Sequence, residues 1–271
     1  MHSDVQTELS VADRVASIGW YQSLRLPGGI RTPGSFDTED ELRRLPFPSS
    51  LNGRRCLDVG TAEGFWAFEM ERRGASEVVA VDVSNAANWD WPGNADPARR
   101  HRYDRERPRL DGFQIAHDAL RSNVQRLDIS IYDLSPESFG EFDFIFVGSL
   151  LLHLRDPVRA LSAVAGVLRG ELLSVDALSP PLTVMHPLQP VARLEAHGYP
   201  MWWAMNLQAY RRLFDVAGLE MLAGGWPFVV KPGPAHVIAP GNQGSLYRRL
   251  RHVVAGRVGT VHSWVRARRQ A

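Results

Sequence analysis

The feature that most constrains this chain is a short apolar strand that runs directly into a turn of small residues. Residues 56–65 read Cys-Leu-Asp-Val-Gly-Thr-Ala-Glu-Gly-Phe. Gly60, Ala62 and Gly64 carry little or no side chain, so the backbone N–H groups of this turn can approach a ligand closely. The residues that follow predict a helix from about 63 to 73. The segment therefore predicts the start of an α/β domain with a ligand-binding turn.

A second apolar strand ends on an acidic residue. Residues 78–81 read Val-Val-Ala-Val, and Asp82 follows them, 24 positions after Asp58. A strand, a turn, a helix, a strand and an acid, in this order, are typical of α/β proteins that bind a nucleoside at the carboxyl ends of their strands. We expect Asp82 to accept hydrogen bonds from ribose hydroxyls, although an acid at the end of a strand is also an ordinary turn residue.

The spacing of the small residues distinguishes between nucleosides. A dinucleotide-binding turn has glycines in the pattern G-x-G-x-x-G, whereas a register that starts at Gly60 places Ala62 and Phe65 at the later glycine positions. The chain instead offers acid-x-Gly-x-small-x-Gly, which resembles motif I of the class I S-adenosylmethionine (SAM) methyltransferases. SAM carries an amino group and no pyrophosphate, so Asp58 beside the turn would attract it. The pattern therefore favours SAM over a nicotinamide or flavin.

Length and composition agree with one large enzyme domain. The chain has 271 residues, 44% of them hydrophobic, and a net charge of +1 that neither requires nor excludes nucleic acid. We expect the single cysteine, Cys56, to be buried, without disulfides. No apolar run approaches the roughly 20 residues of a membrane span, and residues 1–9 lack a signal-peptide core. A cytoplasmic enzyme is the expectation.

The alternation of predicted strands and helices divides the chain into three regions. Residues 1–50 predict an N-terminal cover of helix and loop, and residues 241–271 a basic C-terminal tail. Residues 51–240 predict the SAM-binding methyltransferase domain, with an irregular acceptor-site insertion at about 179–205. The expected fold is α/β, a doubly wound, seven-stranded, mostly parallel sheet of the Rossmann-like class I methyltransferase type.

We also expect an antiparallel terminal hairpin at one edge of this sheet. Residues 219–222 and 228–230 are short apolar runs on either side of Gly224-Gly225. Such a hairpin distinguishes the methyltransferase version of the doubly wound fold.

Two further blocks carry a family resemblance. The block of residues 142–157, with Phe-Asp-Phe-Ile-Phe and Leu-Leu-His-Leu-Arg-Asp-Pro, resembles class I SAM-dependent methyltransferases, and the likeness extends from about 50 to 232. Trp20-Tyr21, residues 30–34 and residues 132–134 add a narrower likeness. With 152–157 they are similar to small relatives of the tRNA wobble-uridine carboxymethyltransferases.

The resemblance implies a role for each residue of a cofactor site. It places Asp58, Gly60, Thr61 and Gly64 at the methionine part of SAM, Asp82 at the ribose, Val83 along the adenine, Tyr132 and Asp133 at the adenine amine, Gly148 and Ser149 under the sulfonium, and Trp20, Tyr21 and Arg31 in a cover over the cofactor. Asp133, followed by Leu-Ser-Pro, is equally a turn-forming residue. Arg31 is a candidate partner for a carboxylate, either of SAM or of its carboxylated relative.

The acceptor side is less defined. His153 follows a predicted strand and is a candidate general base, but it lies in an apolar run where a structural histidine is common. Candidate residues of the acceptor pocket are His186, Arg193, Trp202, Trp203 and Asn206. We expect no metal, because no set of cysteines and histidines has zinc spacing.

Three functions remain open. The first is a SAM-dependent methyltransferase that acts on an oxygen or nitrogen of a small molecule. The second is a tRNA wobble-uridine modifying enzyme, supported by arginines at 99–109 and in the tail, and opposed by the near-zero net charge. The third is a SAM-binding protein without turnover. The basic tail could also contact a membrane surface or a partner, although a solvated basic end is the simpler interpretation.

Overall fold

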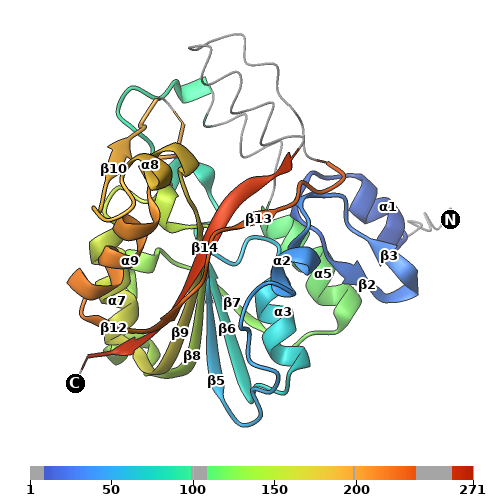
Figure 1. Ribbon diagram of the computed structural model, residues 1–271. Helices are drawn as coiled ribbons and strands as arrows, with labels where there is room; N and C mark the ends of the chain where they lie inside the picture. The colour runs from blue at the N-terminus through green and yellow to red at the C-terminus, as the bar shows by residue number, and fades with distance from the viewer. Residues whose placement is uncertain (1–8, 99, 101–108, 198, 236–257, 271) are drawn as a thin grey trace, which may run out of the picture.

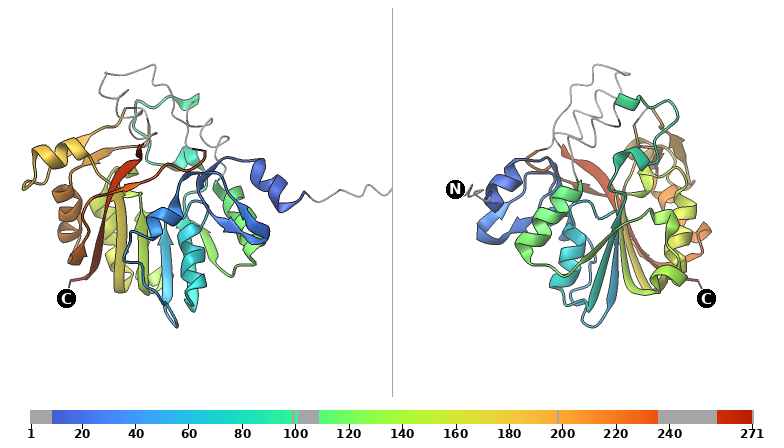
Figure 2. Two further views of the ribbon diagram at one scale, coloured as in Figure 1. Left: turned by 45° about the vertical axis from the view of Figure 1, so that its right-hand side comes forward. Right: turned by 180° about the vertical axis from the view of Figure 1, so that it is seen from behind.

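The structure is a computed structural model, and it describes residues 9–98, 100, 109–197, 199–235 and 258–270. A twisted central sheet runs through the molecule, with helices on both of its faces (Figures 1 and 2). Its parallel strands are β5 (Arg55–Val59), β6 (Glu77–Asp82), β7 (Gln125–Asp128), β8 (Phe142–Gly148) and β9 (Leu168–Ala177). The predicted doubly wound, mostly parallel α/β fold is confirmed.

Three antiparallel strands complete one edge of this sheet. They are β12 (Leu219–Gly224), β13 (Phe228–Val230) and β14 (Thr260–Arg269). The strand order is β12-β14-β9-β8-β5-β6-β7, and β13 also pairs with β14. In the described part of the chain the central sheet therefore has eight strands where seven were expected. Because β14 lies between β12 and β9, one antiparallel strand separates the edge strand from the parallel ones.

The pairing of these antiparallel strands corrects two predictions. The runs 219–222 and 228–230 do not pair with each other as a hairpin, because both pair with β14. Residues 260–269, which were assigned to a basic tail, form β14 itself. Val265 and Ala267 alternate with arginines along this strand and are fully buried. The arginines hid the two-residue period of a half-buried strand.

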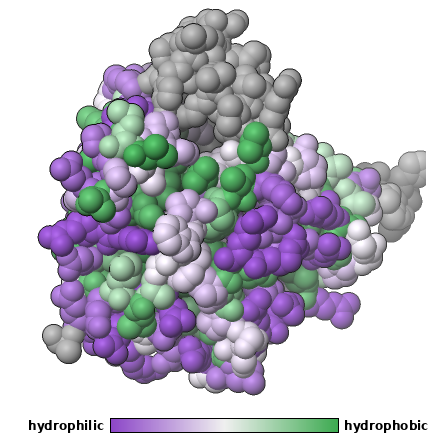
Figure 3. All heavy atoms as spheres, in the orientation of Figure 1, coloured by the Kyte–Doolittle hydropathy of each residue, from purple (hydrophilic) through white to green (hydrophobic). Residues whose placement is uncertain are grey.

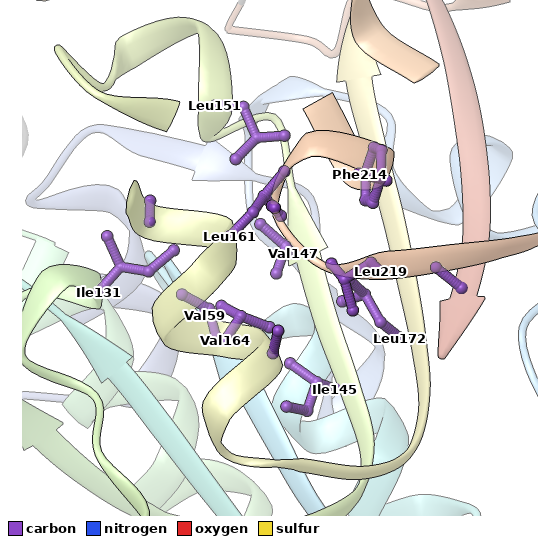
Figure 4. Packing of buried hydrophobic residues seen from close by; sticks show 14 of the residues in the cluster. Val59, Ile131, Ile145, Val147, Leu151, Leu161, Val164, Leu172, Phe214 and Leu219 are labelled. Atoms are coloured by element: carbon purple, nitrogen blue, oxygen red, sulfur yellow. The ribbon is translucent and has the colours of Figure 1, made fainter. Parts of the chain in front are cut away.

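The helices form two layers. α3 (Phe65–Arg72) and α5 (Arg109–Leu120) cover one face of the sheet, and α7 (Pro157–Gly166) and α9 (Leu207–Val216) cover the other (Figures 1 and 2). Figure 4 shows side chains from β8, β9 and α7 that point toward one another between the sheet and the second layer. The short helix α6 (Pro136–Phe139) and the 3-10 turns η2 (Ala86–Asn88), η3 (Ile131–Asp133) and η4 (Leu151–His153) lie in the connections.

The N-terminal cover contains short strands as well as helix and loop. Its elements are α1 (Val11–Ala16), β1 (Trp20–Gln22), β2 (Arg25–Leu26), η1 (Pro27–Gly29), β3 (Ile30–Arg31), β4 (Gly34–Phe36) and α2 (Thr38–Leu42). β1 pairs with β4 in parallel, and β2 pairs with β3 in antiparallel. The cover lies on the same side of the sheet as α3 and α5 (Figure 1).

The expected insertion forms a small unit of its own, outside the central sheet. It contains α8 (Pro180–Met185) and a two-stranded antiparallel sheet of β10 (Ala192–Leu194) and β11 (Trp203–Met205). None of the helices in the described part of the chain combines the length and apolarity of a bilayer span.

Candidate active site

The turn after β5 folds back against the end of β6. The N–H groups of Gly60 and Thr61 both donate to the carbonyl of Val81, at 2.8 and 3.2 Å. Gly60 and Gly64 have φ angles of +76° and +92°, in the left-handed region that favours glycine. A Cβ atom on Gly64 would lie 2.5 Å from the ring of Phe68. Backbone conformation and close packing therefore both require the small residues of this turn.

Asp58 is buried beneath the turn. Its Oδ2 accepts hydrogen bonds from the Thr61 hydroxyl at 2.7 Å and from the Ala67 N–H at 3.2 Å. Its Oδ1 is buried and has no hydrogen-bond partner among the described residues. Burial raises the pKa of Asp58 to about 7, and the nearby Asp82 carboxylate adds to the rise, although the bond from Thr61 opposes it. A cationic amino group placed at Oδ1 would satisfy this atom and favour the carboxylate.

Asp82 ends β6 and faces the same turn. Its Oδ2 accepts from the Ala62 N–H and its Oδ1 from the Val83 N–H, both at 2.8 Å. Ala62 has a φ angle of +50°, so this bond helps to hold an unfavourable backbone conformation. The carbonyl of Val83 in turn accepts from the Trp89 indole N–H at 2.8 Å. The structure therefore brings Asp58 and Asp82 to one turn, as the sequence predicted; their contact with a ligand remains a prediction.

Ser149 follows the end of β8 in a constrained conformation. Its φ angle is +48°, and its N–H donates to the Val175 carbonyl at 2.7 Å. Its hydroxyl lies 3.2 Å from Nε2 of His262 on β14. The other ring nitrogen of His262, Nδ1, lies 2.9 Å from the Thr260 carbonyl. Because a carbonyl only accepts, Nδ1 carries the proton, and Nε2 accepts from Ser149.

His262 was not among the residues predicted from the sequence. Burial lowers its pKa to about 4, so the ring is neutral at pH 7. The residue lies in the segment that was interpreted as a basic tail. The alternation of residues 261–267 would have indicated a strand there, but nothing in the sequence showed that this strand pairs with β9 next to β8.

Tyr132 and Asp133 differ in their surroundings. The Tyr132 hydroxyl donates to Oδ2 of Asp90 at 2.7 Å and accepts from the Asp156 N–H at 3.1 Å. Burial raises the pKa of Tyr132, and the bond to Asp90 adds to the rise. Asp133 is exposed at the end of η3. The Tyr132 hydroxyl therefore bonds two connecting segments of the protein, and a contact of either residue with adenine stays a prediction.

The N-terminal cover is hydrogen-bonded to the glycine turn of residues 60–64, which we call the cofactor turn, through two residues that were not predicted. Glu63 accepts from the backbone N–H groups of Tyr21 and Gln22, at 2.9 and 3.1 Å. The side-chain oxygen of Gln22 accepts from the Phe65 N–H at 3.0 Å, at the start of α3. Trp20 is buried, and its indole N–H donates to Val15 in the cover. Trp20 is thus a core residue of the cover, and Tyr21 lies next to the turn.

Arg31 forms ion pairs within the cover. Its guanidinium lies 3.1 Å from Asp37 and 3.9 Å from Glu39. The candidate carboxylate partner of the cofactor therefore already contacts two carboxylates.

The predicted acceptor residues come from the insertion, but they do not all face a ligand. Asn206 is fully buried, and its amide makes four hydrogen bonds, accepting from Val191 and Ala209 and donating to His186 and Gln189. These four bonds use its whole capacity, so Asn206 caps α9 and holds the loop before β10. That structural role leaves its amide no hydrogen bond for an acceptor.

The tryptophans and His153 join the insertion to the connections that follow β6 and β8. The Trp202 indole N–H donates to the Asp90 carbonyl at 2.5 Å, and that of Trp203 to the Leu154 carbonyl at 3.1 Å. Nδ1 of His153 donates to the Pro200 carbonyl. Proton uptake by a neutral His153 would therefore fall to Nε2.

The two remaining acceptor candidates lie at the surface of the insertion. Arg193 is exposed and pairs with Glu195. His186 is half-buried, after α8.

This architecture defines a class of protein. A parallel doubly wound sheet with an antiparallel strand inserted next to its edge, a glycine turn after the first strand and an acid after the second are the features of the class I methyltransferase fold. A family model described as a methyltransferase domain matches residues 35–223. The chain belongs to this family, and its fold is that of the class I SAM-dependent methyltransferases.

Two curated relatives show different members of that class. The tRNA U34 carboxymethyltransferase of Pseudomonas aeruginosa (strain LESB58) is 28% identical over 147 residues, which cover 54% of this chain and 39% of that enzyme. The ubiquinone biosynthesis O-methyltransferase of Alkalilimnicola ehrlichii is 31% identical over 119 residues, 44% of this chain and 39% of that enzyme. The match thus spans well under half of either relative.

Solved structures show the same fold at low sequence identity. The N-terminal domain of EvdMO1, solved in the presence of S-adenosylhomocysteine and D-fucose, has a TM-score of 0.55 and 17% identity, and the match covers 96% of both chains. A protein of Bacillus halodurans C-125 has a TM-score of 0.53 and 14% identity, and the match covers 86% of this chain and all of that one.

Proposed function

We propose that this protein transfers a methyl group from SAM to an oxygen or nitrogen atom of a small-molecule acceptor. One observation carries the donor side: Oδ1 of Asp58 is buried without a partner beside a left-handed glycine turn. A buried carboxylate oxygen without a partner is costly, and the amino group of SAM would supply the missing donor.

When bound, SAM supplies an electrophilic methyl group on a sulfonium. The protein has to bind, orient and cover it. In this proposal Asp58 accepts from the amino group, Asp82 accepts from the ribose hydroxyls, and Val83 lies along the adenine. Gly148 and Ser149, at the end of β8, lie beneath the sulfonium.

The ion pairs of β14 support a small acceptor over tRNA. Arg266, Arg268 and Arg269 were counted as possible phosphate contacts. The structure pairs them with Glu171 at 3.5 Å, Glu220 at 2.7 Å and Glu141 at 3.2 Å. Arginines already paired with carboxylates are poor substitutes for the counterions that a nucleic acid releases on binding. The other arginines of the predicted tail, and most of those at 99–109, lie outside the described residues.

A tRNA wobble-uridine acceptor is the second candidate, because the Pseudomonas aeruginosa relative is a tRNA U34 carboxymethyltransferase. A carboxylated donor would need a cation for its extra carboxylate. The predicted cation, Arg31, is engaged by Asp37 and Glu39. This favours SAM itself as the donor.

Transfer of radiolabelled methyl groups tests the acceptor class. The protein is incubated with methyl-labelled SAM and, separately, with bulk tRNA or with a panel of phenols, amines and D-fucose. We expect label in at least one small molecule and none in tRNA. Label that enters tRNA alone, with a yield that falls steeply with salt, would replace this proposal with the tRNA function.

A further inference from the structure

A second group of polar side chains lies at the carboxyl edge of the sheet, on the side of β8 away from the cofactor turn. Ser149 follows β8, Asp176 lies near the end of β9, and His262 lies near the start of β14. Glu41 lies on α2 in the N-terminal cover, which contacts the residues that follow β13, and β13 pairs with β14 beside His262. Four segments that are distant in sequence thus meet beside the end of β8.

Three of these four side chains are committed to protein partners. Ser149 and His262 bond each other, and His262 also bonds the Thr260 carbonyl. Asp176 accepts from the N–H groups of Ala177, at 2.7 Å, and Leu151, at 2.8 Å. Asp176 therefore holds the residues that directly follow Ser149. Its burial raises its pKa to about 7, against the effect of these backbone bonds.

Glu41 differs from the others because its carboxyl makes no hydrogen bond to the described residues. It is only 6% exposed. Burial, and then the charge of Asp176, raise the pKa of Glu41 to about 8. A carboxyl group on so little exposed a residue, with neither a cation nor a hydrogen-bond donor beside it among the described residues, is a candidate functional group.

The adjacent residue, Asp40, shows that this is not a general property of α2. Asp40 is equally buried, but it pairs with Arg43 at 3.1 Å, Arg44 at 3.0 Å and Lys231 at 3.6 Å. Burial alone would raise the pKa of Asp40, but the hydrogen bonds from Arg44 and Arg43 bring it below its ordinary value. Figure 3 shows hydrophilic side chains to the right of the centre of this face, where Figure 1 places α2. Arg43, Arg44 and Lys231 therefore form ion pairs with Asp40, and none of these three cations pairs with Glu41.

The position of α2 is fixed by contacts with the chain around β13. The Asp37 N–H donates to the Lys231 carbonyl at 3.2 Å, and Phe36 forms a β-bridge with Pro232. β13 pairs with β14, and its residue Phe228 lies opposite His262. Figure 1 shows α2 beside β13. These contacts keep Glu41 at the carboxyl edge of the sheet.

We propose that Glu41 is the residue that receives the proton of the methyl acceptor. This inference rests on the proposed function, because it needs a sulfonium donor at the end of β8. The O–H or N–H bond of the acceptor breaks, its electron pair stays on the acceptor atom, and the proton forms an O–H bond with a carboxylate oxygen of Glu41. The proton later passes to solvent. His262 would hold the Ser149 hydroxyl in place beside the acceptor group.

The positive charge of the bound SAM sulfonium would prepare Glu41 for this role. Asp176 on β9 and Asp40 on α2 are the acids near Glu41, His262 on β14 is neutral, and Arg43, Arg44 and Lys231 are the cations, which pair with Asp40. A sulfonium placed over Gly148 and Ser149, next to the loop that Asp176 holds, would favour the ionised form of Glu41. Glu41 would then lose its proton when SAM binds, and become able to accept another.

Calorimetry in two buffers of different ionisation enthalpy tests this at pH 7.5, with SAM and S-adenosylhomocysteine as probes. The two probes share the amino group, so proton changes at Asp58 cancel in their comparison. We expect the wild-type protein to release roughly half a proton more with SAM. Glu41→Gln should abolish this difference and keep its affinity for S-adenosylhomocysteine, whereas the matched control Asp40→Asn should keep the difference.

Two further readouts separate a catalytic from a structural role. With an acceptor from the labelled panel, Glu41→Gln should lower kcat about 100-fold or more and remove the rise of kcat with pH. In thermal unfolding, a carboxyl whose pKa is raised in the folded state stabilises the protein below about pH 4.5 and loses this effect as pH rises through about 8. The Tm of Glu41→Gln should therefore fall less between pH 5.5 and 8.5 than that of wild type, which also shows that the variant folds.

The outcomes are distinguishable. If both probes bind and release equal numbers of protons, or if Glu41→Gln behaves as wild type, the inference about Glu41 is wrong and the proposed function stands. If neither probe binds the wild-type protein, the proposed function fails and this inference fails with it.

Discussion

Replacement of Asp82 by alanine should lower the affinity for SAM about 100-fold or more. In the proposed complex this carboxylate accepts from the ribose hydroxyls, and hydrogen bonds to a charged group contribute about 1.5–3 kcal/mol each. The variant also leaves the Ala62 N–H without the acceptor that lies 2.8 Å away in the structure. Both effects act on the same turn. Isothermal calorimetry with SAM measures the change directly.

Glu77→Ala is the matched control for this experiment. Glu77 is the first residue of β6, whereas Asp82 is the last. Glu77 is exposed and pairs with Arg55 at 2.8 Å, at the amino-terminal end of the parallel strands. Loss of an exposed ion pair costs about 1 kcal/mol or less and should leave SAM binding unchanged. Equal losses of affinity in the two variants would show that Asp82 acts on the stability of β6 and not on the ligand.

Replacement of Gly64 by alanine should destabilise the folded protein by about 2–5 kcal/mol. Gly64 has a φ angle of +92°, and a left-handed conformation costs a residue with a Cβ roughly 1–2 kcal/mol. The added Cβ would also lie 2.5 Å from the Phe68 ring and 2.8 Å from the Phe113 ring, and such overpacking adds about 1–3 kcal/mol. Urea unfolding monitored by circular dichroism gives the free energy of unfolding.

Gly53→Ala separates the two contributions. Gly53 also has a positive φ angle, +71°, but a Cβ there would meet no atom within 4 Å. This variant should lose only the conformational part, about 1–2 kcal/mol. If Gly53→Ala and Gly64→Ala are equally destabilised, the packing of α3 and α5 around the cofactor turn is looser than the structure indicates.

The cofactor turn was predictable because its information is local. A glycine turn between two apolar strands requires certain residue types at fixed spacing, since backbone conformation and close packing leave few alternatives. Asp58 and Asp82 could therefore be assigned to one turn without any knowledge of long-range contacts. The same holds for the parallel strands β5, β6 and β8, whose apolar runs are bounded by turn residues.

The far edge of the sheet was not predictable in the same way. β14 carries arginines whose partners, Glu171 on β9 and Glu220 on β12, are distant in sequence. A segment rich in arginine without nearby acids resembles a solvated tail until its neighbours are known. His262 was missed for this reason, because its importance depends on the pairing of β14 with β9.

Contacts between the cover and the domain were also invisible to the sequence analysis. The Gln22 N–H donates to Glu63, and the Gln22 side-chain oxygen accepts from the Phe65 N–H, across a separation of about 40 residues. Neither Gln22 nor Glu63 is a defining residue of a motif. Glu41 lies in a run of acids next to Asp40, and only the positions of the surrounding cations distinguish the two. Such pairs depend on tertiary structure, which residue spacing does not encode.

A crystal structure of the protein with bound S-adenosylhomocysteine would show whether the donor occupies the cofactor turn. We expect the amino group of the ligand to lie within hydrogen-bond distance of Oδ1 of Asp58, and the ribose hydroxyls to contact Asp82. We also expect the sulfur to lie at the end of β8, next to Ser149. A ligand bound elsewhere, or bound at this turn with Oδ1 of Asp58 still unpartnered, would show that Asp58 and Asp82 do not form the donor site.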